Sequence, residues 1–79
     1  MKLNQAVSQR LTELLKERGM TNYALFRKSG VHKSSIGNII NCEYDSVKLR
    51  LLHELCQGLG ITLTEFFDSP LFSEENLEP

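Results

Sequence analysis

The sequence has few of the side chains that build metal centres and active sites. Among its 79 residues there are only two histidines and two cysteines. A zinc site takes four such ligands, and here it would need His32 and Cys42 from one segment together with His53 and Cys56 from another. There is also no nucleophile elbow and no phosphate-binding glycine loop, and so short a chain has little room for a large pocket. We therefore predict no metal, no cofactor and no enzymatic activity.

Long hydrophobic runs are absent as well. No stretch approaches the ~20 apolar residues that span a bilayer, and Lys2 is not followed by the apolar block of a signal peptide. Two cysteines in a chain without an export signal indicate free thiols in a reducing compartment. We therefore expect a cytoplasmic protein that does not associate with a membrane.

A surplus of positive charge is also missing, since the net charge is −1. The charges are nevertheless unevenly placed. Residues 1–61 hold all nine lysines and arginines and five acids, a balance of +4, whereas residues 62–79 hold five acids and no base. A basic body with an acidic tail indicates binding of a polyanion by the body. The alternative is a solvated surface followed by a disordered tail.

Apolar residues recur at helical spacing along the chain, and no segment shows the alternation of a strand. The pattern predicts helices over residues 4–18, 22–29 and 33–41, a fourth after Ser46 and a short fifth after Thr62. Ser46 and Thr62 are the expected caps, and Glu65 completes a capping box with Thr62. The sequence thus predicts an all-α, compact five-helix domain over residues 1–68, followed by a frayed acidic tail over residues 69–79.

The core of this domain is expected to come from two leucine-rich stripes and from the short helices between them. These stripes comprise Val7, Leu11, Leu14 and Leu15 in the first helix, and Leu49, Leu52, Leu55, Cys56 and Leu59 in the fourth. Gly58 interrupts the second stripe and is expected to weaken the end of that helix. Cys56 is expected to be a small core residue.

The most specific feature is the pair of helices at residues 21–41. Two helices joined by about three residues, with a glycine in the turn, form a helix-turn-helix, and here that glycine is Gly30. Leu25, Ile36 and Ile39 would face inward and set the crossing angle. The residues left outside are polar or small, namely Lys33, Ser34, Ser35, Gly37 and Asn38.

A polar front of this kind suits the start of a helix that lies in a DNA major groove. Lys33 can donate to guanine or to phosphate, and Asn38 can pair with adenine. Ser34 and Ser35 can donate or accept, so they would read bases permissively. Gly37 removes a side chain where the groove floor would approach. The alternative is that these residues form a solvated helix face.

These features carry a resemblance to a known family. The segments "LTELLKERGMTNYALFRKSGVHKSSIGNIIN" and "LHELCQGLGITLTEFF" resemble lambda-repressor-like (Cro-type, XRE-family) helix-turn-helix domains over residues 5–67. The resemblance implies base contacts from Lys33, Ser34, Ser35 and Asn38. It also implies phosphate contacts from Asn22 and Asn41. Tyr23 and Arg27, one turn apart on the first motif helix, are further candidates for phosphate contact, unless they only form a solvated face.

The sequence departs from the family pattern at five places in the motif. The first motif helix lacks the usual acid at Ala24, and Tyr23 replaces another. Phe26 stands where the family has a small residue between the two motif helices, and overpacking there typically costs ~1–3 kcal/mol. His32 replaces a serine-like cap and is expected to cap less well. Cys42 replaces the glycine that usually follows Asn41. These changes bear on how the motif docks rather than on the fold.

Near the C-terminus, four apolar residues in a small chain predict an exposed patch. They are Phe66, Phe67, Leu71 and Phe72. The alternative is that the two phenylalanines Phe66 and Phe67 close the bottom of the core. Because the fifth helix often mediates dimerisation in the family, the resemblance implies a homodimer whose recognition helices lie one DNA turn apart, ~34 Å. We therefore expect a sequence-specific regulator of transcription, of the repressor kind, that binds double-stranded DNA. The competing hypothesis is a protein-binding module or antitoxin-type adaptor that holds a protein partner on this patch.

Overall fold

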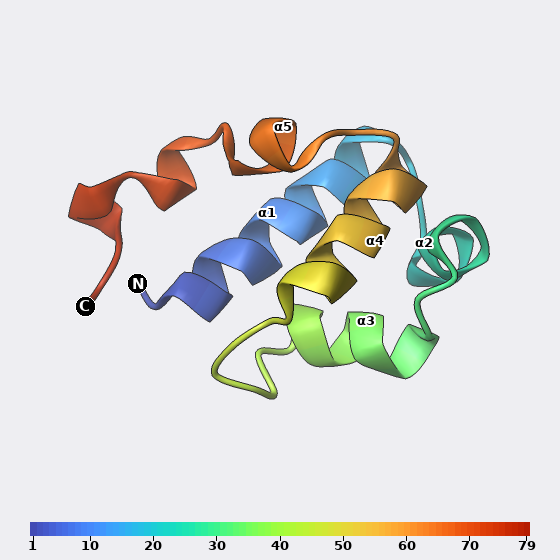
Figure 1. Cartoon of the computed structure of the whole chain (residues 1–79), viewed down its shortest axis with the longest axis horizontal. Helices are drawn as coiled ribbons and strands as arrows, with labels where there is room; N and C mark the ends of the chain where they lie inside the picture. Colours follow the sequence, from blue (N-terminus) through green and yellow to red (C-terminus); the bar gives the residue numbers. More distant parts are fainter.

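The computed structural model describes residues 1–79 as five α-helices followed by two 3-10 turns (Figure 1). The helices are α1 (Leu3–Glu17), α2 (Asn22–Ser29), α3 (Lys33–Ile40), α4 (Leu49–Leu59) and α5 (Leu63–Phe67). The turns are η1 (Pro70–Phe72) and η2 (Glu74–Asn76). This confirms the all-α, five-helix architecture expected from the sequence. None of these helices has both the length and the apolar character needed to cross a membrane.

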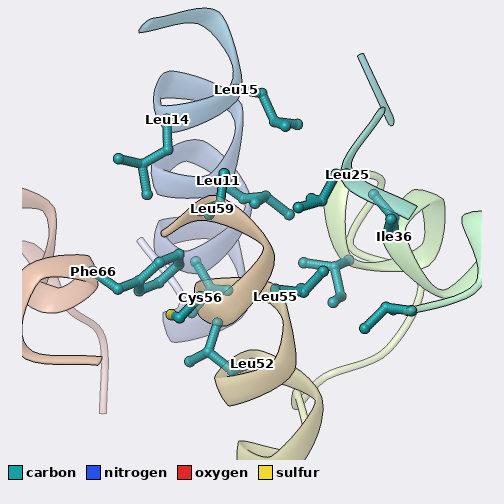
Figure 2. Close-up of a cluster of buried hydrophobic side chains, with 13 residues drawn as sticks. Leu11, Leu14, Leu15, Leu25, Ile36, Leu52, Leu55, Cys56, Leu59 and Phe66 are labelled. Atoms are coloured by element: carbon teal, nitrogen blue, oxygen red, sulfur yellow. The ribbon is translucent and has the colours of Figure 1, made fainter. Parts of the chain in front are cut away.

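One hydrophobic core joins all five helices (Figure 2). Both predicted stripes contribute to it, and Leu25 and Ile36 enter from the motif helices. Phe66 reaches in from α5 and is fully buried. The largest fully buried side chains are Phe66, Leu11, Leu25, Ile36, Leu55 and Cys56. Because the motif helices supply core residues of their own, their orientation is fixed by the same packing that holds α1 and α4.

The start of α4 differs from the prediction. The helix begins at Leu49, and its N-cap is Lys48 with no side-chain hydrogen bond rather than Ser46. Leu49 therefore stands in the first turn, beyond the edge of the core, and is 73% exposed instead of buried. The residues from Asn41 to Lys48 instead form a loop that returns the chain from α3 to α4.

The helix-turn-helix has the boundaries that the sequence predicts, to within one residue. The Thr21 hydroxyl oxygen accepts a hydrogen bond from the Ala24 backbone N–H at 3.0 Å and so caps α2. Gly30 ends α2 in the left-handed conformation, with φ of 76°, and donates its N–H to the Phe26 carbonyl at 2.9 Å. Since only glycine enters this region without strain, the tight turn into α3 depends on this residue.

Two arginines fasten the C-terminal part of the domain to α1. Arg10 donates from Nε to the Phe66 carbonyl at 2.7 Å, and a second nitrogen reaches the Glu65 carbonyl at 2.9 Å. Arg18 donates to the Leu59 carbonyl at 3.1 Å, at the end of α4. These bonds give the carbonyl groups at the ends of α4 and α5 a hydrogen-bond donor from outside their own helix. Both side chains therefore have a structural role.

The expectation that residues 69–79 fray is wrong. The tail forms η1 and η2 and returns to the N-terminus, so that both termini lie at the same end of the molecule (Figure 1). The Met1 amine donates to the Asn76 carbonyl at 2.8 Å, and the Glu78 N–H donates to the Met1 carbonyl at 2.8 Å. The Met1 amine also lies 3.6 Å from the Glu78 carboxylate. Packing of Phe72 against the core holds the first part of the tail in place.

Candidate nucleic-acid interface

The front of α3 presents the polar surface predicted from the sequence. Ile36 and Ile39 are buried and anchor the inner face of the helix. On the outer face, Lys33 and Ser34 are exposed, and Ser35 and Asn38 are half-buried. Nothing lies within 4 Å of the position that a Cβ would occupy on Gly37. The outer face of α3 is thus open to an approaching ligand over its first two turns.

His32 caps α3 despite its unfavourable residue type. Its Nδ1 accepts a hydrogen bond from the Ser34 backbone N–H at 3.2 Å and lies 2.8 Å from the Ser34 hydroxyl oxygen. The imidazole nitrogen thereby replaces the serine oxygen that commonly caps such a helix. The bond needs an unprotonated Nδ1, because only the lone pair can accept.

Phe26 is accommodated at the rim of the junction between α2 and α3. The side chain is half-buried and packs against the outside of the core cluster. Its ring centroid lies 6.0 Å from that of Tyr23 and 6.2 Å from that of His32. These separations are typical of aromatic pairs. The large residue at this position therefore links the exposed side of α2 to the cap of α3.

Cys42 takes over the backbone conformation of the glycine that it replaces. Its φ is 54°, in the left-handed region, and it is the only residue other than glycine with a positive φ. The next residue, Glu43, donates its N–H to the Asn38 carbonyl at 2.9 Å and so closes the end of α3. The Cys42 thiol lies 3.8 Å from the Asn4 carbonyl of α1. The turn after the motif is thus preserved.

The candidate phosphate contacts lie around this surface. Asn22, Tyr23 and Arg27 are exposed on α2, and Asn41 is exposed at the C-cap of α3. Tyr23 also contacts the start of α3, because the Lys33 ammonium lies 5.4 Å from the centre of its ring. The motif therefore brings the predicted base-contacting and phosphate-contacting residues onto two adjoining helices.

Some basic side chains form bonds within the fold, and others remain unpaired on the surface. Arg10 pairs with Glu13 at 3.7 Å and Arg18 with Glu17 at 3.9 Å, and both also bind backbone carbonyls. No ion pair engages the bases of the motif or of the start of α4, which are Arg27, Lys28, Lys33, Lys48 and Arg50. Seven of the nine bases make no ion pair, and five of these seven lie on the motif and the segment that follows it, where attraction to phosphate would be useful. The other two are Lys2 and Lys16, at the two ends of α1.

A groove beside α3 adds residues that the sequence did not single out. It has a volume of about 570 Å³ and lies between α3 and the loop that leads to α4. Its polar lining consists of Ser35, Asn38, Tyr44, Ser46 and Lys48. Tyr44 is 66% exposed, and its backbone carbonyl accepts a hydrogen bond from the Asn4 side chain at 3.0 Å. The sequence feature that could have indicated this groove is the pair Tyr44 and Lys48 in the short loop after the motif.

Comparison with known proteins decides the family. A family model described as the Cro/C1-type HTH DNA-binding domain matches residues 10–70. The chain belongs to this family. A search of curated proteins found no match.

Solved structures of two other proteins superpose closely on the chain. The wild-type restriction-modification controller protein C.Esp1396I has a TM-score of 0.78 and 25% sequence identity, with 86% of this chain and 87% of that chain covered. A structure of the C.Esp1396I tetramer in complex with its natural 35 base-pair operator has a TM-score of 0.79 at 25% identity, with coverage of 86% and 88%. The prophage Lp1 protein 11 has a TM-score of 0.80 at 25% identity, with coverage of 94% and 99%.

Membership of the Cro/C1-type family confirms the resemblance read from the sequence, and it identifies the chain as a DNA-binding domain rather than an enzyme. The matched residues 10–70 include both helices of the helix-turn-helix, α2 and α3. The structure brings no group of three or more histidine, cysteine or acidic side chains together. Burial raises the pKa of the Cys56 thiol, so this core cysteine is held in its neutral form.

The predicted C-terminal patch needs a correction. Phe66 is fully buried in the core and offers no surface to a partner, and Leu71 and Phe72 are half-buried. Phe67 is 37% exposed, and with Leu3 and Leu49 it lines a small hollow of about 140 Å³. Leu3 and Leu49 are themselves 55% and 73% exposed. We call Leu3, Leu49 and Phe67 the apolar patch.

Proposed function

We propose that the chain is a sequence-specific regulator of transcription that places α3 in the major groove of double-stranded DNA. The observation that carries this proposal is the polar outer face of α3. Lys33 and Ser34 are exposed there, Ser35 and Asn38 are half-buried, and Gly37 adds no side chain. Lys33, Ser34, Ser35 and Asn38 would contact base edges. Their place at the front of the helix is where recognition helices of this type contact bases.

Phosphate contacts would fix the register of the protein on the duplex. Asn22 and Arg27 on α2 and Asn41 after α3 are exposed on the two sides of the base-contacting residues. Lys48 and Tyr44, across the groove from α3, extend this surface toward the loop before α4. Free basic side chains on these elements supply the sequence-independent attraction to the DNA backbone.

A homodimer suits this function, and the apolar patch would be its centre. Leu3, Leu49 and Phe67 are exposed and line one hollow, and a contiguous exposed apolar group is the kind of surface that protein partners cover. C.Esp1396I, which shares the fold at 25% identity, is described as a tetramer on its operator. A twofold dimer of this chain would present two α3 helices to a palindromic site, with half-sites one DNA turn apart. Occupation of such a site would block polymerase and so repress transcription.

The test is selection of bound duplexes from a random double-stranded DNA pool at two salt concentrations. We expect enrichment of a palindrome whose half-sites are about 10 base pairs apart, centre to centre. The logarithm of the association constant should fall linearly with the logarithm of salt concentration, with a slope of about 0.9 per phosphate neutralised. Absence of enrichment at both salts would contradict the proposal. A monomeric protein without enrichment would favour the protein-binding alternative.

The Lys33→Ala variant tests the assignment of the base-contacting face. It should relax the preference at one base position by ~1–3 kcal/mol, measured by competition between duplexes that differ at that position. Lys16→Ala is the matched control, because it removes the same charge from an exposed site in the last turn of α1. The control should lower affinity for all duplexes alike, if at all. Identical behaviour of the two variants would remove Lys33 from the reading surface.

A further inference from the structure

Lys33 does not extend freely into solvent, because its ammonium lies over an aromatic ring. The Lys33 Nζ is 5.4 Å from the ring centre of Tyr23, within the distance at which a cation is attracted to the face of a ring. The two residues belong to different helices, since Tyr23 is in the first turn of α2 and Lys33 opens α3. The contact therefore bridges the two halves of the helix-turn-helix.

The Tyr23 ring in turn packs against a second aromatic ring, that of Phe26. Its centroid is 6.0 Å from that of Phe26, and the Phe26 centroid is 6.2 Å from that of His32. Phe26 is half-buried and packed against the core, and His32 is bonded to the Ser34 backbone that begins α3. The three rings thus form a run from the start of α2 to the start of α3. This run depends on the large residue at position 26, where the family has a small one.

We propose that Tyr23 is a positioning residue, whose ring holds the Lys33 ammonium at the DNA-facing surface and which acts on base preference through Lys33 rather than through its own hydroxyl. This inference rests on the proposed function of α3. It replaces the phosphate contact that the sequence suggested for Tyr23. Phe26 would serve the same end, because its ring packs against that of Tyr23.

The physical reason lies in the flexibility of lysine. A lysine side chain has four rotatable bonds, and ordering it on binding opposes association. If the Tyr23 ring already restricts the lysine side chain in the free protein, less conformational entropy is lost on binding. The contact between Lys33 and the base then contributes more to the binding free energy. The ring face attracts the ammonium electrostatically and does not occupy all three of its N–H groups. The remaining N–H groups can still donate to a base or a phosphate.

The contact can be tested first without DNA. In a two-dimensional ¹H–¹³C spectrum of the full chain, the ring current of Tyr23 should shift the Lys33 ε-protons upfield of those of Lys16. Tyr23→Phe, which keeps the ring, should preserve this shift, and Tyr23→Leu should abolish it. A Lys33 ε-proton signal at the position of an unstacked lysine in the unmodified protein would overturn the proposal directly.

The second test uses the duplex that the unmodified protein enriches from the random pool, together with the same duplex changed at the base read by Lys33. Tyr23→Phe should bind both as the unmodified protein does. Tyr23→Leu should reduce the preference between them roughly two- to five-fold, the effect of an exposed cation–π contact. In the Lys33→Ala background, Tyr23→Leu should have no further effect on that preference. The slope of affinity against salt should be the same for Tyr23→Phe and Tyr23→Leu.

The outcomes separate the two proposals. A protein that enriches no duplex refutes the proposed function, whereas the spectral test still decides whether Tyr23 holds Lys33. A protein that binds selectively, with weaker binding of both duplexes by Tyr23→Phe, would show that the tyrosine hydroxyl contacts phosphate and would overturn the positioning role. Tighter binding by Tyr23→Leu would overturn it as well, because the ring would then compete with DNA for Lys33. Since Tyr23 is 54% exposed, these substitutions should leave the fold intact, which thermal melting monitors.

Discussion

At the scale of single residues, Gly58 sets how closely α2 approaches α4. A Cβ placed on Gly58 would lie 2.6 Å from the Ser29 Cβ and 3.0 Å from two Ser29 backbone atoms. Backbone atoms at the end of α2 cannot move away without moving the turn that leads to α3. The sequence alone suggested only that Gly58 weakens its helix. The contact that requires a glycine there connects positions 29 and 58, and no local pattern reveals it.

Gly58→Ala should therefore destabilise the protein although alanine is the better helix former. Overpacking of this kind costs ~1–3 kcal/mol, against a gain of ~1 kcal/mol in helix propensity. Gly37→Ala is the control, because nothing lies within 4 Å of its added methyl group. The control should raise the free energy of unfolding by up to ~1 kcal/mol. Urea denaturation of both variants measures the difference, and two variants of equal stability would contradict the close approach.

The departures from the family pattern show what can be predicted for individual residues. The sequence flagged Phe26, His32 and Cys42 as sites of stress in the motif, and each proved to be accommodated. Phe26 packs at the rim of the junction, His32 caps α3 through Nδ1, and Cys42 adopts a φ of 54°. The direction of a side chain and the tolerance of a turn depend on neighbours from other helices, so composition and spacing could not supply them.

At the scale of elements, residue types that favour a helix end stand at most of the helix ends, but such a residue predicted the start of α4 wrongly. Thr21 and Thr62 act as caps, and Gly30 and Gly60 end their helices in the left-handed conformation. Ser46 carried the same signal at the start of α4, yet the helix begins three residues later. Where a helix starts depends on the preceding loop as well as on the capping residue. Here the loop from Asn41 to Lys48 is bonded to α1 through the Asn4 side chain, and the helix starts after that loop.

The capping box of α5 predicts a dependence of stability on pH. A hydrogen bond from the Thr62 backbone N–H, assisted by the Thr62 side chain and the charge of Arg18, lowers the pKa of Glu65 from its ordinary value. The folded protein thus binds a proton at Glu65 less readily than the unfolded chain does. The stabilisation is fully present above the ordinary carboxyl pKa of about 4.3 and is lost as the pH falls through the lowered value.

Glu65→Gln should therefore show a difference from the unmodified protein that depends on pH. The unmodified protein should be the more stable at pH 6, and the difference should shrink as the pH is lowered toward 3. Thermal melts over this range measure it. Glu75→Gln is the control, because Glu75 is exposed and its side chain makes no hydrogen bond or ion pair. A difference that is the same at every pH would show that the carboxylate charge is not what stabilises the cap.

At the scale of the whole molecule, the fold determines which of the charged residues in the basic body and the acidic tail are paired and which remain free. Two of the arginines, Arg10 and Arg18, are used within the fold. The acidic tail returns to the N-terminus and pairs with the Met1 amine. Five of the other seven bases are left free on α2, α3 and the start of α4, and Lys2 and Lys16 lie at the two ends of α1. The sequence could predict that the body binds a polyanion, but pairing across the fold decides which bases remain available.

The dimer expected from the sequence can be tested at the most exposed part of the apolar patch. Leu49 is 73% exposed, so Leu49→Ser removes little from the monomer core and should leave the unfolding temperature nearly unchanged. If a second copy covers the patch, loss of one leucine from each side should shift the protein from dimer to monomer in sedimentation at micromolar concentration. Binding to a palindromic duplex should weaken in parallel, because each α3 would then bind its half-site alone.

Tyr44→Ser supplies the control for this experiment. Tyr44 is nearly as exposed, at 66%, but lines the groove beside α3 rather than the apolar patch. Its substitution should leave the dimer intact. If Leu49→Ser sediments as a dimer, the second copy is held elsewhere on the molecule, and the apolar patch loses its assignment. If both variants sediment as monomers, the interface extends across the loop from Asn41 to Lys48, and dimerisation and DNA binding then share Tyr44.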